Sequence, residues 1–179
     1  MNLGCFGVDP GGATGLAWGI FDPGAGGVAE ALKTRLHAGS TTVDGEERRQ
    51  IKAIATAWGD FYQDCVHTRR LPPENIYLVM ENFIYTGANY AGDSAKISTA
   101  IIWGLEGYRM GRRDEWKKHR RGRAHMPTMV LQNAGDAKAF AKPDLLKEWG
   151  VWVVGRDHER SAWQHIAYFL QRYRIQYRL

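Results

Sequence analysis

The most constraining feature of this sequence is an apolar run that ends in a carboxylate and a glycine turn. Residues 4–8 are followed by Asp9 and by Pro-Gly-Gly at 10–12, and a second apolar run covers residues 16–21. Proline and paired glycines between two such runs predict a β-hairpin. Because aspartate is a poor strand residue, Asp9 either begins the turn or serves as a metal ligand at the end of the first strand.

A second carboxylate ends another apolar run further along the chain. Residues 76–80 are continuously apolar, which is typical of a strand buried on both faces at the centre of a sheet. Glu81 follows this run directly. Glutamate has no turn-forming tendency that would explain the position, so a functional role is favoured more strongly here than for Asp9.

The remaining elements follow from hydrophobic periodicity and from the positions of proline and glycine. We expect a third strand at 30–37, helices at 44–67 and 93–110, a strand at 126–132, two helical pieces within 134–149, and a last helix from about residue 156. Asp44 is the expected N-cap of the first helix, and residues 151–154 fit either a strand or a packed loop. This order predicts one α/β domain spanning 1–179. Its mixed five-stranded sheet would have three antiparallel strands first and helices on its faces.

The first turn of the last helix holds a cluster of acidic and histidine residues. Asp157, His158 and Glu159 lie there, and Ser161 and His165 follow at helical spacing. Residues 158, 161 and 165 share one face of the helix, and 157 lies on the same side as 161. Acidic residues at a helix N-terminus are frequent because they favour the macrodipole. The macrodipole does not explain why His158 and His165 lie along the apolar side.

The net charge of +5 is concentrated in one segment. Residues 111–125 hold seven Arg or Lys residues and two acidic residues, so this segment accounts for the whole excess. A basic segment on an otherwise balanced domain is typical of a protein that binds a polyanion, most often nucleic acid. A solvated charged loop is the alternative interpretation.

Composition argues against several other classes of protein. No apolar window approaches the length of a membrane span, and the first residues lack the basic and apolar parts of a secretion signal. Cys5 and Cys65 are far apart in the sequence and have no histidine at zinc-site spacing. We therefore expect a chain of the reducing cytoplasm, without a disulfide scaffold or a structural zinc.

Carboxylates that are brought together repel each other unless a cation neutralises them. Mg²⁺ and Mn²⁺ prefer such oxygen ligands. Two of these ions about 4 Å apart can activate a water and stabilise the leaving oxygen in phosphodiester hydrolysis. Asp9, Glu81 and the acidic cluster of the last helix, together with the basic segment, therefore predict a metal-dependent nuclease.

The chain resembles a known family at these positions. Residues 7–11 with 14–15, the run into Glu81, and residues 158–162 are similar to motifs of the RuvC-like Holliday junction resolvases of the ribonuclease H-like superfamily, especially of their phage-encoded branch. The resemblance implies a ribonuclease H-like fold and a homodimer that nicks four-way DNA junctions with Mg²⁺ or Mn²⁺ in the cytoplasm, that of a bacterial host if the protein is phage-encoded. It also implies that Asp9 and Glu81 are metal ligands and that His158 is the first member of a C-terminal metal-binding pair.

The sequence departs from the family pattern at Ser161, where the second member of that pair is normally aspartate. Serine is a poor ligand for a divalent cation. We therefore expect Asp157, one turn back on the same side of the helix, to supply the missing charge. His158 would bind the metal or activate the attacking water, and Glu159 is the spare candidate.

The expected DNA contacts are aromatic and basic residues. Phe83 and Tyr85 follow Glu81, where the family places an aromatic that probes the opened junction, and bases stack well on aromatic rings. Packing in the core or in a loop is the alternative for both. The basic residues expected to meet phosphates are Arg112, Arg113, Lys117, Lys118, Arg120, Arg121, Arg123 and Lys138. By resemblance, the helix at 93–110 packs at the dimer interface.

Two other functions fit parts of the sequence. Sugar kinases and chaperone ATPases share the expected fold and open with a glycine hairpin that holds phosphates, but they need two such domains, and 179 residues supply one. A branched-DNA-binding protein with weak or no nuclease activity also fits, because Ser161 stands where aspartate is expected.

Overall fold

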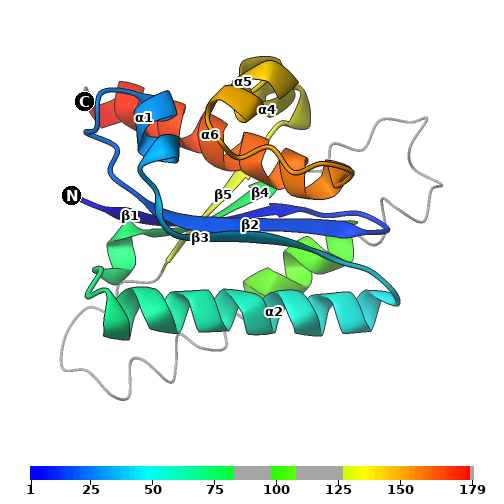
Figure 1. Ribbon diagram of the computed structural model, residues 1–179. Coiled ribbons are helices and arrows are strands. Elements are labelled where there is room, and N and C mark those ends of the chain that lie inside the picture. The colour runs from blue at the N-terminus through cyan, green and yellow to red at the C-terminus, as the bar shows by residue number, and fades with distance from the viewer. Residues whose placement is uncertain (83–97, 108–126, 178–179) are drawn as a thin grey trace.

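The computed structural model describes residues 1–82, 98–107 and 127–177. Five strands form one sheet (Figure 1), in the spatial order β3 (Leu36–Val43), β2 (Thr14–Phe21), β1 (Leu3–Asp9), β4 (Ile76–Glu81) and β5 (Thr128–Gln132). β1, β2 and β3 pair antiparallel, whereas β4 runs parallel to β1 and β5 runs parallel to β4. This topology confirms the predicted mixed sheet with three antiparallel strands first.

The pairing of β1 brings the two strand-ending carboxylates to the same end of the sheet, where β1 and β4 finish. Its antiparallel register with β2 places Asp9 opposite Gly15 at the predicted hairpin turn. Its parallel pairing with β4 brings Glu81 to the same edge, and β5 places Gln132 opposite Glu81. The carboxyl ends of three parallel strands therefore meet there.

The third strand begins later in the chain than predicted. Residues 30–33 belong to the helix α1 (Val28–Lys33), and β3 starts only at Leu36. Alanine, glutamate, leucine and lysine in this range are strong helix formers. The buried residues of α1 pack into the same core as α6 (Asp157–Tyr177). The prediction of a strand at 30–37 was therefore wrong.

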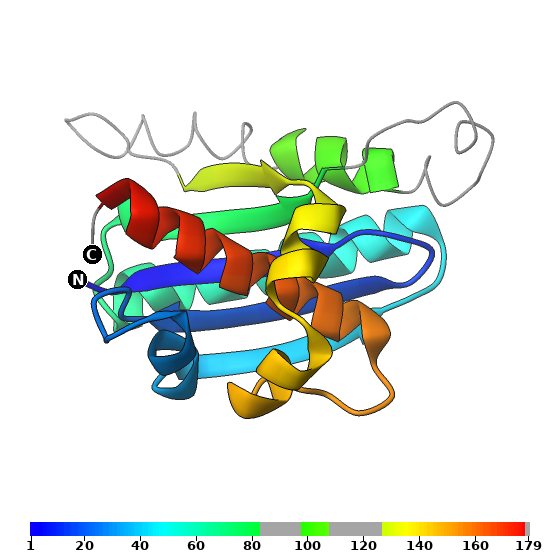
Figure 2. The same ribbon diagram turned by 90° about the horizontal axis from the view of Figure 1, so that it is seen from above.

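Two hydrophobic cores lie on the two faces of the sheet. On one face α6 crosses the strands, accompanied by α1, α4 (Ala134–Phe140) and α5 (Pro143–Glu148) (Figure 2). On the other face lie α2 (Glu47–Gln63), which continues into a π-helical turn at Asp64–Thr68, and the helix at 98–107 (Figure 1). The result is a sheet between two layers of helices.

The other element boundaries lie close to the predictions. The N-cap position of α2 is Glu46 and not Asp44, and residues 151–154 form a loop. A short 3₁₀ turn at Pro73–Asn75 leads into β4. The ends of the helix predicted at 93–110 lie outside the described residues. Among the described helices, none combines the length and the apolar character that a membrane crossing demands.

Candidate metal centre

Three side chains from three elements converge where β1 and β4 end. Asp9 ends β1, Glu81 ends β4, and His165 comes from α6. One ligand atom from each lies within 4.8 Å of the other two, and all three residues are buried or partly buried. Two carboxylates at this separation fit Mg²⁺ or Mn²⁺, which need few protein ligands and retain bound waters.

The two carboxylates cannot both ionise easily without a cation. Burial, a hydrogen bond with Glu81 and the negative charge of Glu81 raise the pKa of Asp9 to about 8, while Lys138 acts in the opposite direction. Burial also acts to raise the pKa of Glu81, but its contacts with His165 and Asp9 and the charge of Lys138 hold that pKa below its usual value. The metal-free pair therefore holds one proton, on Asp9, at neutral pH. A divalent cation would replace this proton.

His165 is fully buried, and its Nε2 atom faces the carboxylates. Nε2 lies 3.6 Å from Oε2 of Glu81 and has no hydrogen-bond partner among the described residues. Nδ1, on the other side of the ring, lies 3.1 Å from the side-chain amide of Gln132. Buried polar atoms without a partner are rare in native proteins, so this atom indicates a site that is completed by a ligand or by a small movement.

His158 lies on the open side of the group. Its Nδ1 is 3.1 Å from Oδ2 of Asp9, and its side chain is 47% exposed, compared with 10% for Asp9. The imidazole therefore connects a buried carboxylate to the solvent.

Asp157 lies outside this group. Its side chain is 81% exposed and forms an ion pair with Arg160 in the same turn of α6. Ser161 is partly buried and offers no carboxylate. The expectation that Asp157 replaces the missing aspartate therefore requires a rearrangement of the first turn of α6.

Glu159, the spare candidate, binds the sheet and not the group formed by Asp9, Glu81 and His165. Its buried carboxylate accepts hydrogen bonds from Ser40 at 2.6 Å and Thr42 at 3.0 Å, both in β3, and from Arg156 at 2.9 Å. These bonds attach the start of α6 to the edge strand. They also hold the neighbouring His158 close to Asp9.

Two glycines let α6 approach the hairpin closely. A Cβ atom at Gly7 would lie 2.6 Å from the carbonyl oxygen of Ala162, and one at Gly15 would overlap the carbonyl group of His158. Because Gly15 pairs with Asp9, this close approach of α6 occurs beside the candidate metal ligands.

Hydrogen bonds from the opposite face hold the turn that follows Asp9. Buried Gln50 of α2 accepts from the Thr14 hydroxyl at 2.7 Å and donates to the Gly12 carbonyl at 2.8 Å. Ser98 donates to the Pro10 carbonyl at 2.9 Å. The backbone beside Asp9 is therefore preformed.

Most of the predicted DNA contacts fall outside the described residues. They are Phe83, Tyr85, Arg112, Arg113, Lys117, Lys118, Arg120, Arg121 and Arg123. Lys138 is described: it is exposed on α4, and its charge lowers the pKa of both Asp9 and Glu81. Its positive charge therefore acts on both carboxylates.

His165 and Gln132 were not predicted as site residues. Helical spacing had already placed His165 on one face with His158 and Ser161, which was the available signal. Gln132 had no such signal, because it reaches His165 through the pairing of β5 with β4.

No protein-family model and no curated protein matches the sequence. Solved structures match along nearly the whole chain. A Thermus thermophilus RuvC structure has a TM-score of 0.57 and 14% identity, and the match covers 98% of this chain and 97% of that chain. T. thermophilus RuvC in complex with a Holliday junction substrate has a TM-score of 0.55 and 14% identity, with 97% and 96% covered.

This chain has a RuvC-like fold. The fold is the mixed-sheet, ribonuclease H-like arrangement that the sequence resemblance implied. At 14% identity the likeness describes architecture, so the function has to be argued from the residues of the site.

Proposed function

We propose that this protein is a metal-dependent endonuclease that cuts branched DNA, with four-way junctions as its principal substrate. The observation that carries the proposal is the convergence of Asp9, Glu81 and the buried, unpaired Nε2 of His165 at the edge of the described sheet. The likeness in fold to a RuvC structure that contains a Holliday junction substrate supports the choice of substrate.

Each residue of the site would have its own role in metal binding, proton transfer or phosphate binding. Asp9 and Glu81 would hold Mg²⁺ or Mn²⁺ through oxygen atoms. When bound, the metal lowers the pKa of a water and stabilises the charge that develops on the phosphate. His158, half exposed beside Asp9, would accept the proton of the attacking water. Lys138 adds positive charge toward the bound phosphate.

The lack of a ready carboxylate for a second metal ion favours an alternative function. Ser161 offers no carboxylate, and Asp157 would join a second ion only after its ion pair with Arg160 breaks. A branched-DNA-binding protein with weak or no nuclease activity would tolerate this arrangement. The two candidates share a fold and a DNA substrate, and they differ in whether the strand is cut.

DNA binding in this proposal depends on the basic segment at 111–125 and on Phe83 and Tyr85, which would stack on opened bases. The functional unit would be one domain spanning 1–179 that acts in the cytoplasm. By sequence resemblance it would belong to the phage-encoded branch, and the compartment would then be that of a bacterial host.

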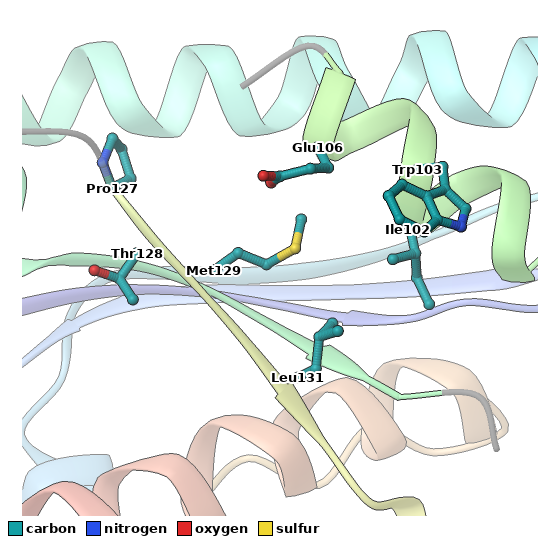
Figure 3. Close-up of a pocket in the computed structure, with 7 residues that line it drawn as sticks. All are labelled: Ile102, Trp103, Glu106, Pro127, Thr128, Met129 and Leu131. Atoms are coloured by element: carbon teal, nitrogen blue, oxygen red, sulfur yellow. The ribbon is translucent and has the colours of Figure 1, made fainter. Parts of the chain in front are cut away.

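A homodimer is part of the proposal, and an apolar groove supports it. The groove lies between the helix at 98–107 and the edge strand β5 (Figure 3), and it is lined by Ile102, Trp103, Glu106, Pro127, Thr128, Met129 and Leu131. Trp103 is 70% exposed and Leu131 is 44% exposed, and contiguous apolar surface of this kind marks interfaces. Trp103→Lys is therefore expected to give a monomer in sedimentation experiments in which the wild type is a dimer. An unchanged dimer would place the interface elsewhere.

A nicking assay on a synthetic four-way junction tests the proposed activity. The wild type is expected to make symmetric nicks with Mg²⁺ or Mn²⁺ and none with a chelator. Asp9→Asn and Glu81→Gln should abolish cutting while the junction still shifts in a gel. Asp60→Asn, at an exposed position of α2, is the matched control and should cut normally. A wild type that shifts the junction but cuts it with neither metal would establish the DNA-binding alternative.

A further inference from the structure

The side chain of Gln132 decides which nitrogen of His165 carries the proton. In one orientation, the amide nitrogen donates to Nδ1 of His165 at 3.1 Å and to the carbonyl oxygen of His165 at 3.0 Å, while the amide oxygen accepts from the backbone N–H of Phe169 at 3.2 Å. The reversed amide would place its oxygen against a carbonyl and its NH₂ group against an N–H. Three hydrogen bonds therefore select the first orientation.

The orientation of Gln132 fixes the tautomer of His165. Because Nδ1 accepts a hydrogen bond, the proton of the neutral imidazole lies on Nε2. Nε2 is the atom that faces the carboxylates, 3.6 Å from Oε2 of Glu81 and without a hydrogen-bond partner in the described part of the chain. The ring therefore presents an N–H to the site and not a lone pair. A small approach of Glu81 would satisfy this buried donor.

We propose that His165 positions Glu81 by donating its Nε2–H to that carboxylate, and that it is not a ligand of the metal. The inference rests on the proposed function, since it concerns the same site. Asp9 and Glu81 would then hold the metal through oxygen atoms, and His165 would orient the Glu81 carboxylate. Such bonds orient ligating carboxylates and raise metal affinity.

The opposite assignment, in which Nε2 of His165 binds the metal, would cost contacts. A free lone pair on Nε2 requires the proton on Nδ1, and Gln132 would then have to reverse its amide. Reversal loses the bonds to the His165 carbonyl and from Phe169, and it brings like groups together. The two assignments also differ in metal preference. An all-oxygen site favours Mg²⁺ and Mn²⁺, whereas an imidazole ligand suits Zn²⁺.

NMR reads the position of the proton directly. In protein labelled with ¹⁵N-histidine near neutral pH, long-range ¹H–¹⁵N correlations distinguish the two tautomers, and the loss of one set of signals in His165→Gln assigns them to His165. We expect a protonated Nε2 and an unprotonated Nδ1, both without metal and with saturating Mg²⁺. A protonated Nδ1, whether or not Nε2 also carries a proton, would overturn the inference.

Two variants at position 165 provide a readout that does not depend on cutting. Glutamine keeps an N–H donor of similar reach, and its amide oxygen is a weaker ligand than an imidazole nitrogen, whereas leucine offers neither a donor nor a ligand atom. In a Mn²⁺ titration followed by the EPR signal of the free ion, His165→Gln should stay within about threefold of the wild-type affinity, while His165→Leu should weaken it by about 10–100-fold. Equal, large losses in both variants would identify the imidazole as a ligand. His67→Leu, at an exposed position, is the matched control and should bind like the wild type.

The nicking assay separates this inference from the proposed function. If the wild type fails to cut but His165 carries its proton on Nε2, the nuclease proposal fails and the tautomer assignment stands. If the wild type cuts but Nε2 is unprotonated, the nuclease proposal stands and the role of His165 as a donor fails.

Discussion

A methyl group added at Gly15 should move His158, at the start of α6, away from Asp9 and Glu81 in the sheet. Gly15 pairs with Asp9 in the hairpin and lies directly beneath the start of α6. In Gly15→Ala, the new Cβ would overlap the carbonyl group of His158 and lie 2.7 Å from the backbone nitrogen of Glu159, where ordinary contacts begin at 3.4 Å. The helix would therefore have to move by more than the difference between these distances, about 0.7 Å, because the carbonyl group of His158 lies closer still.

The size of the effect follows from this displacement. Overpacking a tight contact costs about 1–3 kcal/mol of the free energy of unfolding. For a chain of this length, that corresponds to a fall of about 2–12 °C in Tm. The effect on cutting should be larger, because a misplacement of about 1 Å at a reacting centre can cost about 100-fold in rate. His158 moves away from Asp9 in this variant, whereas Asp9 and Glu81 keep their places in the sheet.

Thermal denaturation and the junction-nicking rate, measured on the same preparation, check both parts. Gly12→Ala is the matched control, because nothing lies within 4 Å of a Cβ built there, and it should leave both measurements near wild type. A Gly15→Ala protein with wild-type Tm and wild-type cutting would refute the argument, since α6 would then not be held against the hairpin. A lowered Tm with normal cutting would refute the role given to His158.

Three further outcomes follow from buried titratable groups. The pKa of Asp9 is raised to about 8, so the folded, metal-free protein binds more protons than the unfolded chain and loses stability as pH rises from about 4 to about 8. Asp9→Asn should therefore melt higher than wild type at pH 8 with a chelator, with the difference vanishing at acidic pH; an advantage that grows toward low pH would contradict this sign. Glu159→Gln should lower the free energy of unfolding by about 1–3 kcal/mol in denaturant titrations, because it weakens bonds to a buried charge, yet leave Mn²⁺ affinity unchanged. A lost affinity would make Glu159 a ligand after all. Burial and the charge of Asp64 raise the pKa of Cys65 to about 12, so a thiol reagent at pH 8 should label it only in denaturant, and fast labelling of the native protein would contradict its burial.

Local signals in the sequence were sufficient for the central hairpin and for the strand that ends at Glu81. Proline and two glycines between apolar runs have few conformations other than a turn. A continuous apolar run needs cover on both faces, which a central strand provides. The positions of Asp9 and Glu81 at strand ends follow from these two facts, and parallel pairing of the strands then brings them to one edge.

The error at 30–37 has a non-local cause. Six helical residues and a weakly alternating strand have similar apolar patterns, and the short α1 helix is stabilised mainly by the core beneath α6. That core is assembled from segments far apart in the chain, so no window of the sequence contains it.

The amino-acid sequence was enough to show that the last helix carries candidate ligands. It left several of them open, because the residues of the first turns point to different sides of the helix. Which turn of the helix meets the carboxylates depends on the rotation of α6 about its axis, and contacts between distant segments set this rotation. Gly7 and Gly15 set the distance of the helix from the hairpin, and Glu159 binds its start to β3. These long-range contacts turn Asp157 toward solvent and His165 toward Glu81.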